Sequence, residues 1–472
     1  MSQTVTIPVW LFFLLLFISL IVFINRLLFP GVRWFFRKKV NKAIEELNQR
    51  LNIEIRPFQL TKRQVLLDRL VHDSQVLTFV QKQSLEDEIP REVLLEKVRR
   101  YASEIVPSFN AYIYYRVGYW LSKKLTKLLY SVRVNQDQQE KLINLNKEST
   151  VVFVMNHRSN MDYILVSFLV AEKMALSYAV GEWAKVWPLH SLIKSMGAYF
   201  VRRNSRNPLY RKVLERYIDM ATREGVCQAV FPEGGLTRDG KLRSPKLGFL
   251  DYMLRNYDFE RDRDIIFIPV GINYDRVLED RTLLLSLREN EAKPGRWYTV
   301  KTTFRFIWNN LRLAQRHQWQ RYGFACVNFD EPISCQNYCL KNSVNFSLLS
   351  TKKRFEAVES LACYLMNSVE KTVPAVPVTL ICATLSRFLI ASEQNQVERS
   401  LIVEEAQQLM FRIEKEDGKV LFPNKDKKVM LEAAIDRLIL RRIISEENKM
   451  LRVSPEQDEL ISYYANSIFC WK

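Results

Sequence analysis

The chain has 472 residues, 48% of them hydrophobic and 26% charged, with 13 glycines and 16 prolines. This composition excludes a wholly disordered chain, a collagen-like chain and a chain dominated by linkers. The 70 lysines and arginines outnumber the 52 acidic residues, which gives a formal charge of +18. We therefore expect an anionic partner, which can be nucleic acid, a membrane surface or a phosphorylated small molecule.

The seven cysteines are odd in number and form no paired pattern. We interpret them as free, mostly buried thiols in a reducing compartment. Cys335 and Cys339 are close enough in sequence to suggest metal ligands, but no second cysteine pair and no histidine lies near them. We therefore predict no metal site.

Residues 7–24 form an uncharged apolar run of 18 residues. As a helix, this run is just long enough to cross a hydrocarbon core of roughly 30 Å. A signal peptide is the alternative, but no cation precedes the run and no small-residue cleavage pattern precedes Arg26. Five cations follow it within residues 26–39, so the positive-inside rule predicts a single-pass anchor in the inner (cytoplasmic) membrane, with the body of the protein in the cytosol.

Residues 40–134 are predicted to be helical, because apolar side chains from Phe109 to Leu128 recur at steps of three and four residues. Lys123, Lys124 and Lys127 lie in the same stretch, together with several tyrosines. Such a helix either packs its apolar stripe on its own domain or lies in a membrane interface. The pattern leaves both alternatives open.

The middle of the chain has short apolar runs that alternate with helix-length stretches. Strands are predicted at residues 151–155, 175–180, 199–201, 227–231, 265–272 and 324–329, and helices at 160–172 and 208–223. This alternation predicts an α/β fold with a mostly parallel sheet covered by helices. Functional sites in such folds usually form at the carboxyl ends of the strands.

The remainder of the chain is predicted to be helical. Residues 373–391 are apolar but contain Pro374, Pro377 and Arg387, so we do not predict a membrane span there. We expect four regions. Residues 1–39 are an anchor with its basic flank, and residues 40–134 are a helical region that packs on its own domain or lies in a membrane interface. Residues 135–335 are an α/β core, and residues 336–472 are a helical C-terminal region.

His157 stands in the clearest chemical setting, since it follows the predicted strand at 151–155 and precedes Asp162 by five residues. The carboxylate of Asp162 can fix the imidazole tautomer and leave the other ring nitrogen free to accept a proton. Alternatively, Asp162 is a favourable charge in the first turn of a helix and His157 is merely capped.

Two further segments carry cations after predicted strands. Arg202 and Arg203 follow the strand at 199–201, and guanidinium groups suit phosphate, although a solvated basic edge is the alternative. The strand at 227–231 leads into Glu233, Gly234 and Gly235 and then into a basic loop with Arg238, Lys241, Arg243 and Lys246. The glycines allow close approach of a ligand to the backbone. Pro269 is expected to end a strand.

These segments together resemble the four ordered blocks of the glycerolipid acyltransferase superfamily: His157-x-x-x-x-Asp162, GAYFVRR, FPEGG with a later arginine, and IPV with Tyr274. More closely, NHRSNMDYILVS and FPEGGLTRDGKLRSPKLG resemble the bacterial membrane-bound glycerol-3-phosphate acyltransferases. VNFDEPIS and ELISYYANSI extend the resemblance from about residue 134 to the C-terminus.

The resemblance implies transfer of a fatty acyl group from a thioester to the sn-1 hydroxyl of glycerol 3-phosphate, giving lysophosphatidic acid for phospholipid synthesis. The donor would be acyl-CoA or an acyl carrier protein, and no cofactor is required. His157 would be the base and Asp162 its partner. The resemblance assigns substrate binding to the other blocks, here Arg202, Arg203, Glu233, Gly234, Arg238, Lys241 and Pro269.

One departure from the family pattern concerns the phosphate site. Close relatives have Arg-Ser-Arg after the two glycines, whereas this chain has Leu236-Thr237-Arg238. Lys241 or Arg243 would have to replace the missing cation; otherwise the acceptor is lysophosphatidic acid, dihydroxyacetone phosphate or another lysolipid.

Two other classes of function find less support in the sequence. A nucleic-acid-binding protein would explain the charge, but the cations form no dense tract and no zinc finger or RNA-binding signature is present. A hydrolase or metal enzyme would need a second clustered histidine or a Gly-x-Ser-x-Gly turn, and the sequence has neither. The expected partners are therefore a phospholipid membrane and the two substrates.

Overall fold

The structure is a computed structural model. It describes residues 8–9, 16, 19, 54–135, 145–171, 173–181, 189–202, 205–285, 322–391, 396–421 and 426–471. The predicted anchor at 7–24 lies almost entirely outside these residues, and so does Arg203. None of the helices in the described part of the chain combines the length and the apolar composition that crossing a membrane requires.

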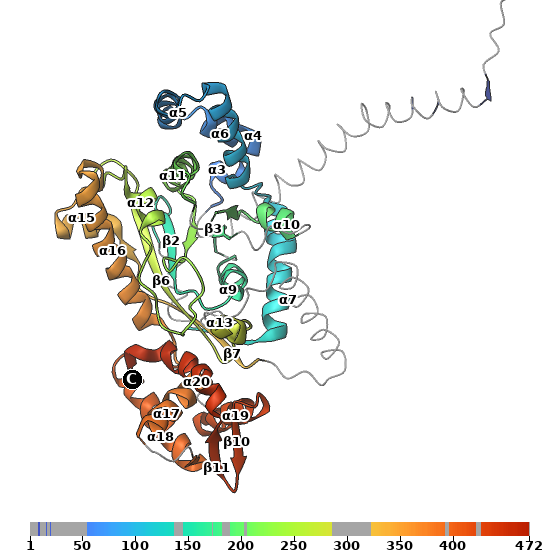
Figure 1. Ribbon diagram of the computed structural model, residues 1–472, viewed down its shortest axis with the longest axis vertical. Helices are drawn as coiled ribbons and strands as arrows, with labels where there is room; N and C mark the ends of the chain where they lie inside the picture. The colour runs from blue at the N-terminus through green and yellow to red at the C-terminus, as the bar shows by residue number, and fades with distance from the viewer. Residues whose placement is uncertain are drawn as a thin grey trace, which may run out of the picture.

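An eight-stranded sheet forms the centre of the molecule (Figure 1). Its strands are β1 (Ser131–Val134), β2 (Thr150–Met155), β3 (Ser177–Val180), β4 (Tyr199–Phe200), β5 (Gln228–Val230), β6 (Ile265–Tyr274), β7 (Phe324–Phe329) and β8 (Ile333–Ser334). The order is β1-β7-β6-β2-β5-β3-β4, with β8 beside β6. All pairs are parallel except those of β6 with β7 and β8. The predicted α/β fold with a mostly parallel sheet is confirmed.

The central strand β2 has helices on both of its faces. Val151, Phe153 and Met155 point into one apolar core, which includes α9 (Met161–Val170) and residues of the C-terminal region. Val152 and Val154 point into a second core. That core contains residues of α11 (Pro208–Arg223), α12 (Gly248–Leu254) and α16 (Thr351–Thr372). The run of apolar residues in β2 is therefore what a strand buried on both faces requires.

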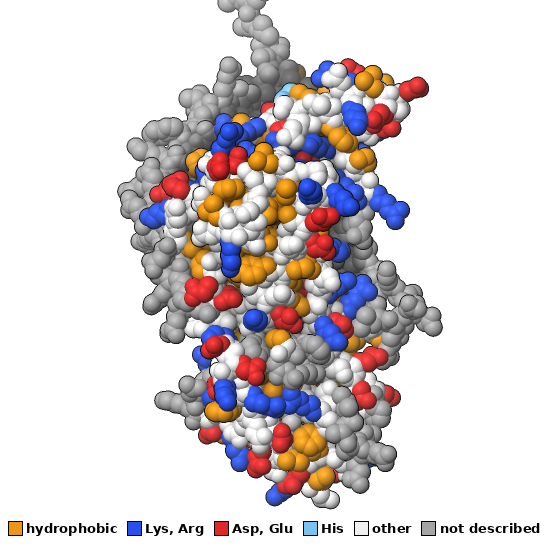
Figure 2. Space-filling model, turned by 90° about the vertical axis from the view of Figure 1, so that its left-hand side faces the viewer, with side chains coloured by type: hydrophobic (Ala, Val, Ile, Leu, Met, Phe, Trp, Pro, Cys, Tyr) orange, Lys and Arg blue, Asp and Glu red, His pale blue; other side chains and the backbone are white. Residues whose placement is uncertain are grey.

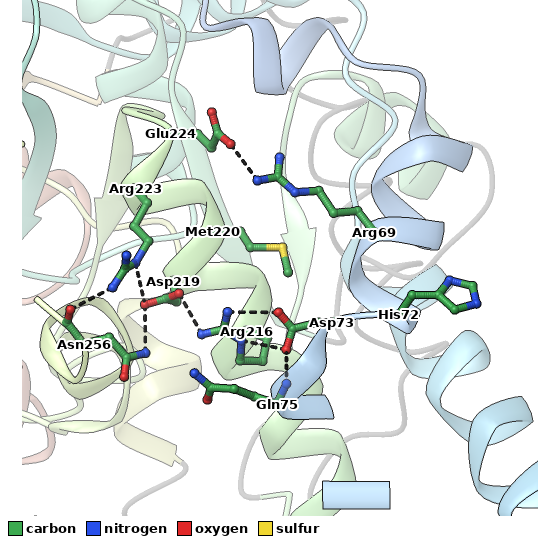
Figure 3. A pocket seen from close by; sticks show the side chains of 10 residues that line it. All are labelled: Arg69, His72, Asp73, Gln75, Arg216, Asp219, Met220, Arg223, Glu224 and Asn256. Atoms are coloured by element: carbon green, nitrogen blue, oxygen red, sulfur yellow. Dashed lines mark hydrogen bonds and ion pairs between the residues drawn. The ribbon is translucent and has the colours of Figure 1, made fainter. Parts of the chain in front are cut away.

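The N-terminal helices pack against α11 (Figure 1). They are α3 (Pro57–Leu60), α4 (Arg63–Val71), α5 (Ser74–Glu86) and α6 (Arg91–Ile105). Between α4, α5 and α11 lies a polar cavity of about 500 Å³, shown in Figure 3. Arg216 of α11 reaches across to Asp73, the N-cap of α5, and also pairs with Asp219. Ion pairs therefore attach this helical region to the core.

The helix α7 (Tyr119–Leu129) continues the π-helix η2 (Ile113–Gly118) and lies beside α9. Its buried face carries small or polar residues, among them Ser122 and Thr126. Trp120 is 57% exposed and Val117 42% exposed. The apolar stripe is thus only partly exposed, since Leu121, Leu125 and Leu128 are half-buried. Packing on the helix's own domain and contact with a membrane interface both stay predictions.

The C-terminal region contains more than helices. Its helices are α15 (Cys335–Asn342), α16, α17 (Pro377–Ala391), α18 (Arg399–Lys415), α19 (Lys427–Leu440) and α20 (Asp458–Ala465). A three-stranded antiparallel sheet of β9 (Gln396–Glu398), β10 (Ile444–Glu447) and β11 (Met450–Val453) accompanies them. The prediction of a helical region at 336–472 missed this small sheet, because its strands are short and exposed, with charges at Glu446 and Glu447.

Figure 2 shows the molecule from the side on which α15 and α16 lie in Figure 1. Apolar side chains gather in the middle of this face, and cationic and acidic side chains are interspersed around them. Exposed apolar residues of α15 and α16 include Leu340, Phe355 and Tyr364. On this face the positive charge of the chain is thus spread among acidic residues and does not form a single basic field.

Candidate active site

Three adjacent strands bring the predicted catalytic residues together. The parallel strands β6, β2 and β5 are neighbours in the sheet, so their carboxyl ends lie at one edge. His157 lies in the turn after β2, Glu233 in the turn after β5, and Tyr274 is the last residue of β6. The sheet topology therefore places these side chains side by side although up to 117 positions separate them in sequence.

His157 and Asp162 form a direct hydrogen bond. The distance from His157 Nδ1 to Asp162 Oδ2 is 2.9 Å, and both side chains are buried. The carboxylate can accept only from a protonated Nδ1, so in the neutral ring Nε2 carries the lone pair. His157 Nε2 is buried and has no hydrogen-bond partner among the described residues. In this arrangement Nε2 of His157 can accept a proton, as a general base must.

Asp162 is held by more than the imidazole. Its Oδ2 accepts the backbone N–H groups of Arg158 at 2.7 Å and Ser159 at 3.0 Å. Its Oδ1 accepts the hydroxyl of Tyr274 at 2.7 Å. Asp162 therefore closes the turn as the capping alternative supposes and also orients His157, so the two interpretations hold together. Burial, with the Asp162 carboxylate beside it, raises the pKa of the Tyr274 phenol well above its ordinary value, so Tyr274 stays a donor.

The turn before α9 is fixed by residues near β6. The amide of Asn156 donates to Ile272 O at 2.9 Å and accepts from Ile272 N at 2.8 Å, which extends the β2–β6 pairing by a side chain. The buried carboxylate of Glu279 accepts the Ser159 hydroxyl at 2.8 Å and the Asn160 backbone N–H at 3.2 Å. A negative charge at the start of α9 is favourable because helix N-termini are electropositive.

Glu233 joins the turns after β5 and β2. Its Oε1 accepts the His157 backbone N–H at 2.8 Å, and its Oε2 accepts the Arg243 backbone N–H at 3.2 Å. In return, Thr237 N–H donates to His157 O at 2.9 Å. Burial raises the pKa of Glu233 to about 7, against the opposing effect of these hydrogen bonds. Glu233 thus binds one backbone N–H group in each of the two turns.

The two glycines after Glu233 make room for cationic side chains. Gly234 has φ +67°, and a Cβ there would collide with the side chain of Lys246. The guanidinium of Arg243 lies beside Gly235. Arg238 and the other cations of this loop are exposed. The loop therefore carries positive charge immediately beside the turn that holds His157.

Arg202 lies apart from His157. It follows β4, three strand positions from β2, which corresponds to about 14 Å at the usual strand spacing. Its guanidinium binds both carboxylate oxygens of Glu104, at 2.7 to 3.2 Å, and lies over the rings of Tyr101 and Tyr210. Hydrogen bonding to Glu104 raises the pKa of Arg202. The described contacts of Arg202 are thus with α6 and α11.

Pro269 lies inside β6, where it pairs with Val154 of β2. The expectation that Pro269 ends a strand is wrong, because β6 continues for five residues beyond it. Its carbonyl accepts the Asp330 N–H at 2.9 Å, which places the missing N–H on the side where β7 has ended and β8 has not begun. The proline is tolerated at this point because no strand there needs its N–H.

Sequence reasoning missed several residues of the site. Neither Arg158 nor Glu279 was predicted to belong to it. Arg158 lies within the predicted motif, and Glu279 is an acidic residue five positions after the end of β6, which is where a sequence search could have found it. Among the described residues, no group of three or more histidine, cysteine, aspartate and glutamate side chains is placed to hold a metal ion.

Comparison with known proteins defines the class first. The family described as acyltransferase matches residues 133–273, which include β2, β5, β6 and the His157–Asp162 pair. The family described as the glycerol-3-phosphate acyltransferase C-terminal region matches residues 307–471. The two matches follow each other along the chain and together leave residues 1–132, 274–306 and 472 uncovered.

Individual relatives have a more specific name than the family matched at residues 133–273. A glycerol-3-phosphate acyltransferase of Aeromonas hydrophila is 28% identical over 434 residues, covering 87% of this chain and 50% of its own length. One of Xanthomonas campestris is 24% identical over 442 residues, covering 91% of this chain and 48% of its own. The chain is thus similar over most of its length to proteins named glycerol-3-phosphate acyltransferase. It spans about half the length of the curated relatives it matches.

A solved structure is also similar. The crystal structure of the 1-acyl-sn-glycerophosphate (LPA) acyltransferase PlsC from Thermotoga maritima is 16% identical. The match covers 65% of this chain and 94% of that one, with a TM-score of 0.32.

Proposed function

We propose that this chain is an O-acyltransferase that moves a fatty acyl group from a thioester to the sn-1 hydroxyl of glycerol 3-phosphate, producing lysophosphatidic acid for phospholipid synthesis. The observation that carries the proposal is the 2.9 Å hydrogen bond between His157 Nδ1 and Asp162, which leaves Nε2 without a partner among the described residues. The relatives named glycerol-3-phosphate acyltransferase support the choice of acceptor.

In the proposed mechanism, His157 Nε2 takes the proton of the acceptor hydroxyl while its oxygen attacks the thioester carbonyl. The negative charge of Asp162 stabilises the imidazolium that forms. When the tetrahedral intermediate collapses, the carbon–sulfur bond breaks, and the imidazolium returns the proton to the departing thiolate. The products are the ester and the free thiol. Because a thiolate is a good leaving group, the chemistry requires neither an acyl-enzyme nor a cofactor.

The basic loop after Gly235 supports a phosphate site close to His157. Arg238 and Lys241 belong to this loop, and the Arg243 and Lys246 side chains already lie against the two glycines. We assign Arg243 the place of the cation that Leu236 does not supply. Arg203, which lies outside the described residues, would bind phosphate as the resemblance implies, and Arg202 would act through its pairing with Glu104. Pro269 would support the site from inside β6 by letting β7 give way to β8.

The missing cation also supports a second acceptor. Leu236 puts an apolar, half-buried side chain where a cation is expected. An acceptor that already carries an acyl chain, lysophosphatidic acid, would find apolar surface there. The acyl donor is either acyl-CoA or an acyl carrier protein.

Association with a membrane is the part of the proposal that concerns location. We propose that residues 7–24 anchor the chain once in the inner membrane, with the body in the cytosol. Exposed side chains of η2 and α7 support a membrane-facing surface. They are the apolar Val117 and Trp120 and the cations Arg116, Lys124 and Lys127. In this proposal residues 1–39, 40–134, 135–335 and 336–472 serve as anchor, interfacial helices, catalytic core and C-terminal support.

The test uses the full chain in detergent, with labelled acyl-CoA or labelled acyl carrier protein as the donor. Glycerol 3-phosphate, dihydroxyacetone phosphate and lysophosphatidic acid are offered separately. We expect product from glycerol 3-phosphate, and a loss of at least a thousandfold in His157→Ala. His72→Ala is the matched control, because His72 is exposed at the C-terminal end of α4 and lines a cavity that contains none of the predicted site residues. Absence of product with every acceptor, or an active His157→Ala variant, would refute the proposal.

A further inference from the structure

The C-terminal helix α20 contacts the loops that form the active site. Its Tyr463 and Tyr464, and Asn466 and Ser467 just beyond, reach the turn after β2, the loop after β5 and the end of β6. These are the same three strand ends that bring His157, Glu233 and Tyr274 together. The C-terminal region therefore packs against the turn that contains His157.

Arg158 is the side chain that joins the catalytic turn to α20. It directly follows His157, is 2% exposed, and is among the largest fully buried side chains of the described residues. Its guanidinium lies 5.2 Å from the centre of the Tyr463 ring, and its Nη1 donates to Gly240 O at 3.2 Å. Its Nε and Nη2 have no hydrogen-bond partner among the described residues, so the ring face is a principal favourable contact of this buried charge.

Backbone geometry transmits the position of Arg158 to the imidazole. The N–H of Arg158 donates to Asp162 Oδ2 at 2.7 Å, and the same oxygen accepts from His157 Nδ1. A shift of the Arg158 main chain would therefore move the carboxylate that orients His157. The path runs from the Tyr463 ring through the Arg158 guanidinium and its own backbone to Asp162.

Neighbouring contacts keep α20 in place. A Cβ on Gly240, whose φ is +84°, would collide with the Tyr463 carbonyl, so the loop after β5 approaches α20 as closely as backbone allows. Asn466 Nδ2 donates to Asp239 O at 3.0 Å, and Tyr464 accepts the Val277 N–H at 3.1 Å. Tyr464 also donates to Asp280, which Arg441 binds too.

We infer that Arg158 and Tyr463, whose ring packs against the Arg158 guanidinium, are positioning residues for the His157–Asp162 pair. This inference rests on the proposed function, because its main readout is acyl transfer. It assigns the C-terminal region a part in the chemistry, although none of the described side chains of that region hydrogen-bonds to the His157 imidazole.

The test compares three variants of the full chain. Tyr463→Leu removes the ring beneath Arg158, Tyr463→Phe restores the ring without the hydroxyl, and Leu460→Ala makes a cavity in the buried face of the same helix. We expect Tyr463→Leu to lower kcat about tenfold with little change in the KM for the acceptor, since small displacements of a catalytic pair have large effects. Tyr463→Phe should recover most of the activity. Leu460→Ala should lower the melting temperature but leave the kcat of the folded protein unchanged.

A second readout needs no substrate. The chain has only four histidines, so selective ¹⁵N labelling gives few imidazole signals, and His157→Gln identifies that of His157. We expect Tyr463→Leu to shift the Nδ1–H proton resonance of His157 and Leu460→Ala to leave it in place. If no donor and acceptor pair gives product, the proposed function fails while this resonance still tests the positioning. Equal loss of kcat in Tyr463→Leu and Leu460→Ala, or an unmoved resonance in Tyr463→Leu, would overturn the inference.

Discussion

Asp162 and Asp219 are both buried carboxylates that bind a neighbouring basic side chain, but they lie at opposite edges of the sheet. Asp162 follows the carboxyl end of β2 and binds His157. Asp219 lies in the second half of α11, which leads to the amino end of β5, and it binds Arg216 at 2.8 Å and Asn256 at 3.1 Å. Figure 3 shows three arginines around Asp219, and each of them is paired with a carboxylate: Arg69, Arg216 and Arg223.

The difference between these two networks is whether the chain itself satisfies every group. The guanidinium of Arg216 donates to both Asp73 and Asp219. These ion pairs attach α5 to α11, and Arg216 is therefore not available to bind a ligand. In the other network, the imidazole is held on one side by Asp162 and its Nε2 has no partner among the described residues. A cavity is therefore a weaker sign of function than a buried polar atom that is oriented and left unpaired.

The largest effect is expected from neutralising Asp162. Asp162→Asn keeps the shape of the side chain, but its amide can no longer stabilise an imidazolium and can bind the wrong tautomer of His157. We expect kcat to fall about ten-thousandfold, as loss of the oriented carboxylate costs in comparable catalytic triads. Steady-state kinetics measure this. Asp219→Asn is the matched control, for which we expect kcat to be retained.

Next in size is the loss of the cation in the structural network. Arg216→Met leaves the buried carboxylates of Asp73 and Asp219 without their shared partner. We expect the free energy of unfolding to fall by about 3 kcal/mol, because an uncompensated buried charge is costly. Urea denaturation measures it. A variant that lost acyl transfer while remaining folded would contradict the separation of the two networks.

A similar magnitude is expected for the pH dependence that Glu233 introduces. Because burial raises its pKa to about 7, the folded chain binds this proton more tightly than the unfolded chain. The stabilising contribution of the bound proton is present below the ordinary pKa of a glutamate and is lost as the pH rises through about 7. Between pH 4 and 8 this loss is roughly 3 kcal/mol.

The variant Glu233→Gln tests this assignment because it removes the titrating group and keeps one acceptor for the His157 N–H. Its free energy of unfolding should fall less steeply with rising pH than that of the unaltered chain. Urea denaturation at a series of pH values measures the two slopes, and equal slopes would show that Glu233 is not the titrating group.

The smallest effect is expected from Tyr274→Phe. This change removes the hydroxyl that donates to Asp162 Oδ1 at 2.7 Å and leaves the other hydrogen bonds to the carboxylate in place. We expect a loss of about 1.5 kcal/mol in transition-state stabilisation, which is roughly tenfold in kcat/KM. Tyr322→Phe, on a ring that packs nearby, serves as the control. A loss as large as that of Asp162→Asn would place Tyr274 in direct contact with the reaction.

The sequence was most informative where a pattern is local. All six strands predicted in the middle of the chain are present, and α11 has the predicted bounds of 208–223. His157 and Asp162 could be paired from sequence because a five-residue interval across a strand-to-helix turn brings them together. The same reasoning failed for Pro269, since only the change from β7 to β8 beside it explains why a proline fits inside β6.

Features that depend on distant contacts could not be predicted. The pairing of Arg202 with Glu104 joins residues 98 positions apart. The exposure of Trp120 depends on how α7 packs against α9, and an amphipathic pattern does not say which face is buried. Glu279 reaches the start of α9 from more than a hundred positions away. In each case the partner, and not the residue itself, determines the role.

The alternation of side chains along β2 has a consequence for how the molecule unfolds. Val151, Phe153 and Met155 belong to the core that includes α9 and the helices α17 to α20, and Val152 and Val154 to the core that includes the N-terminal helices, α11 and α16. Either core can open while the other still covers one face of the strand. Native-state hydrogen exchange should therefore show two separate opening events, with the amides of β2 exchanging only when both have occurred. The strand that precedes His157 would be the last of the described strands to lose its structure.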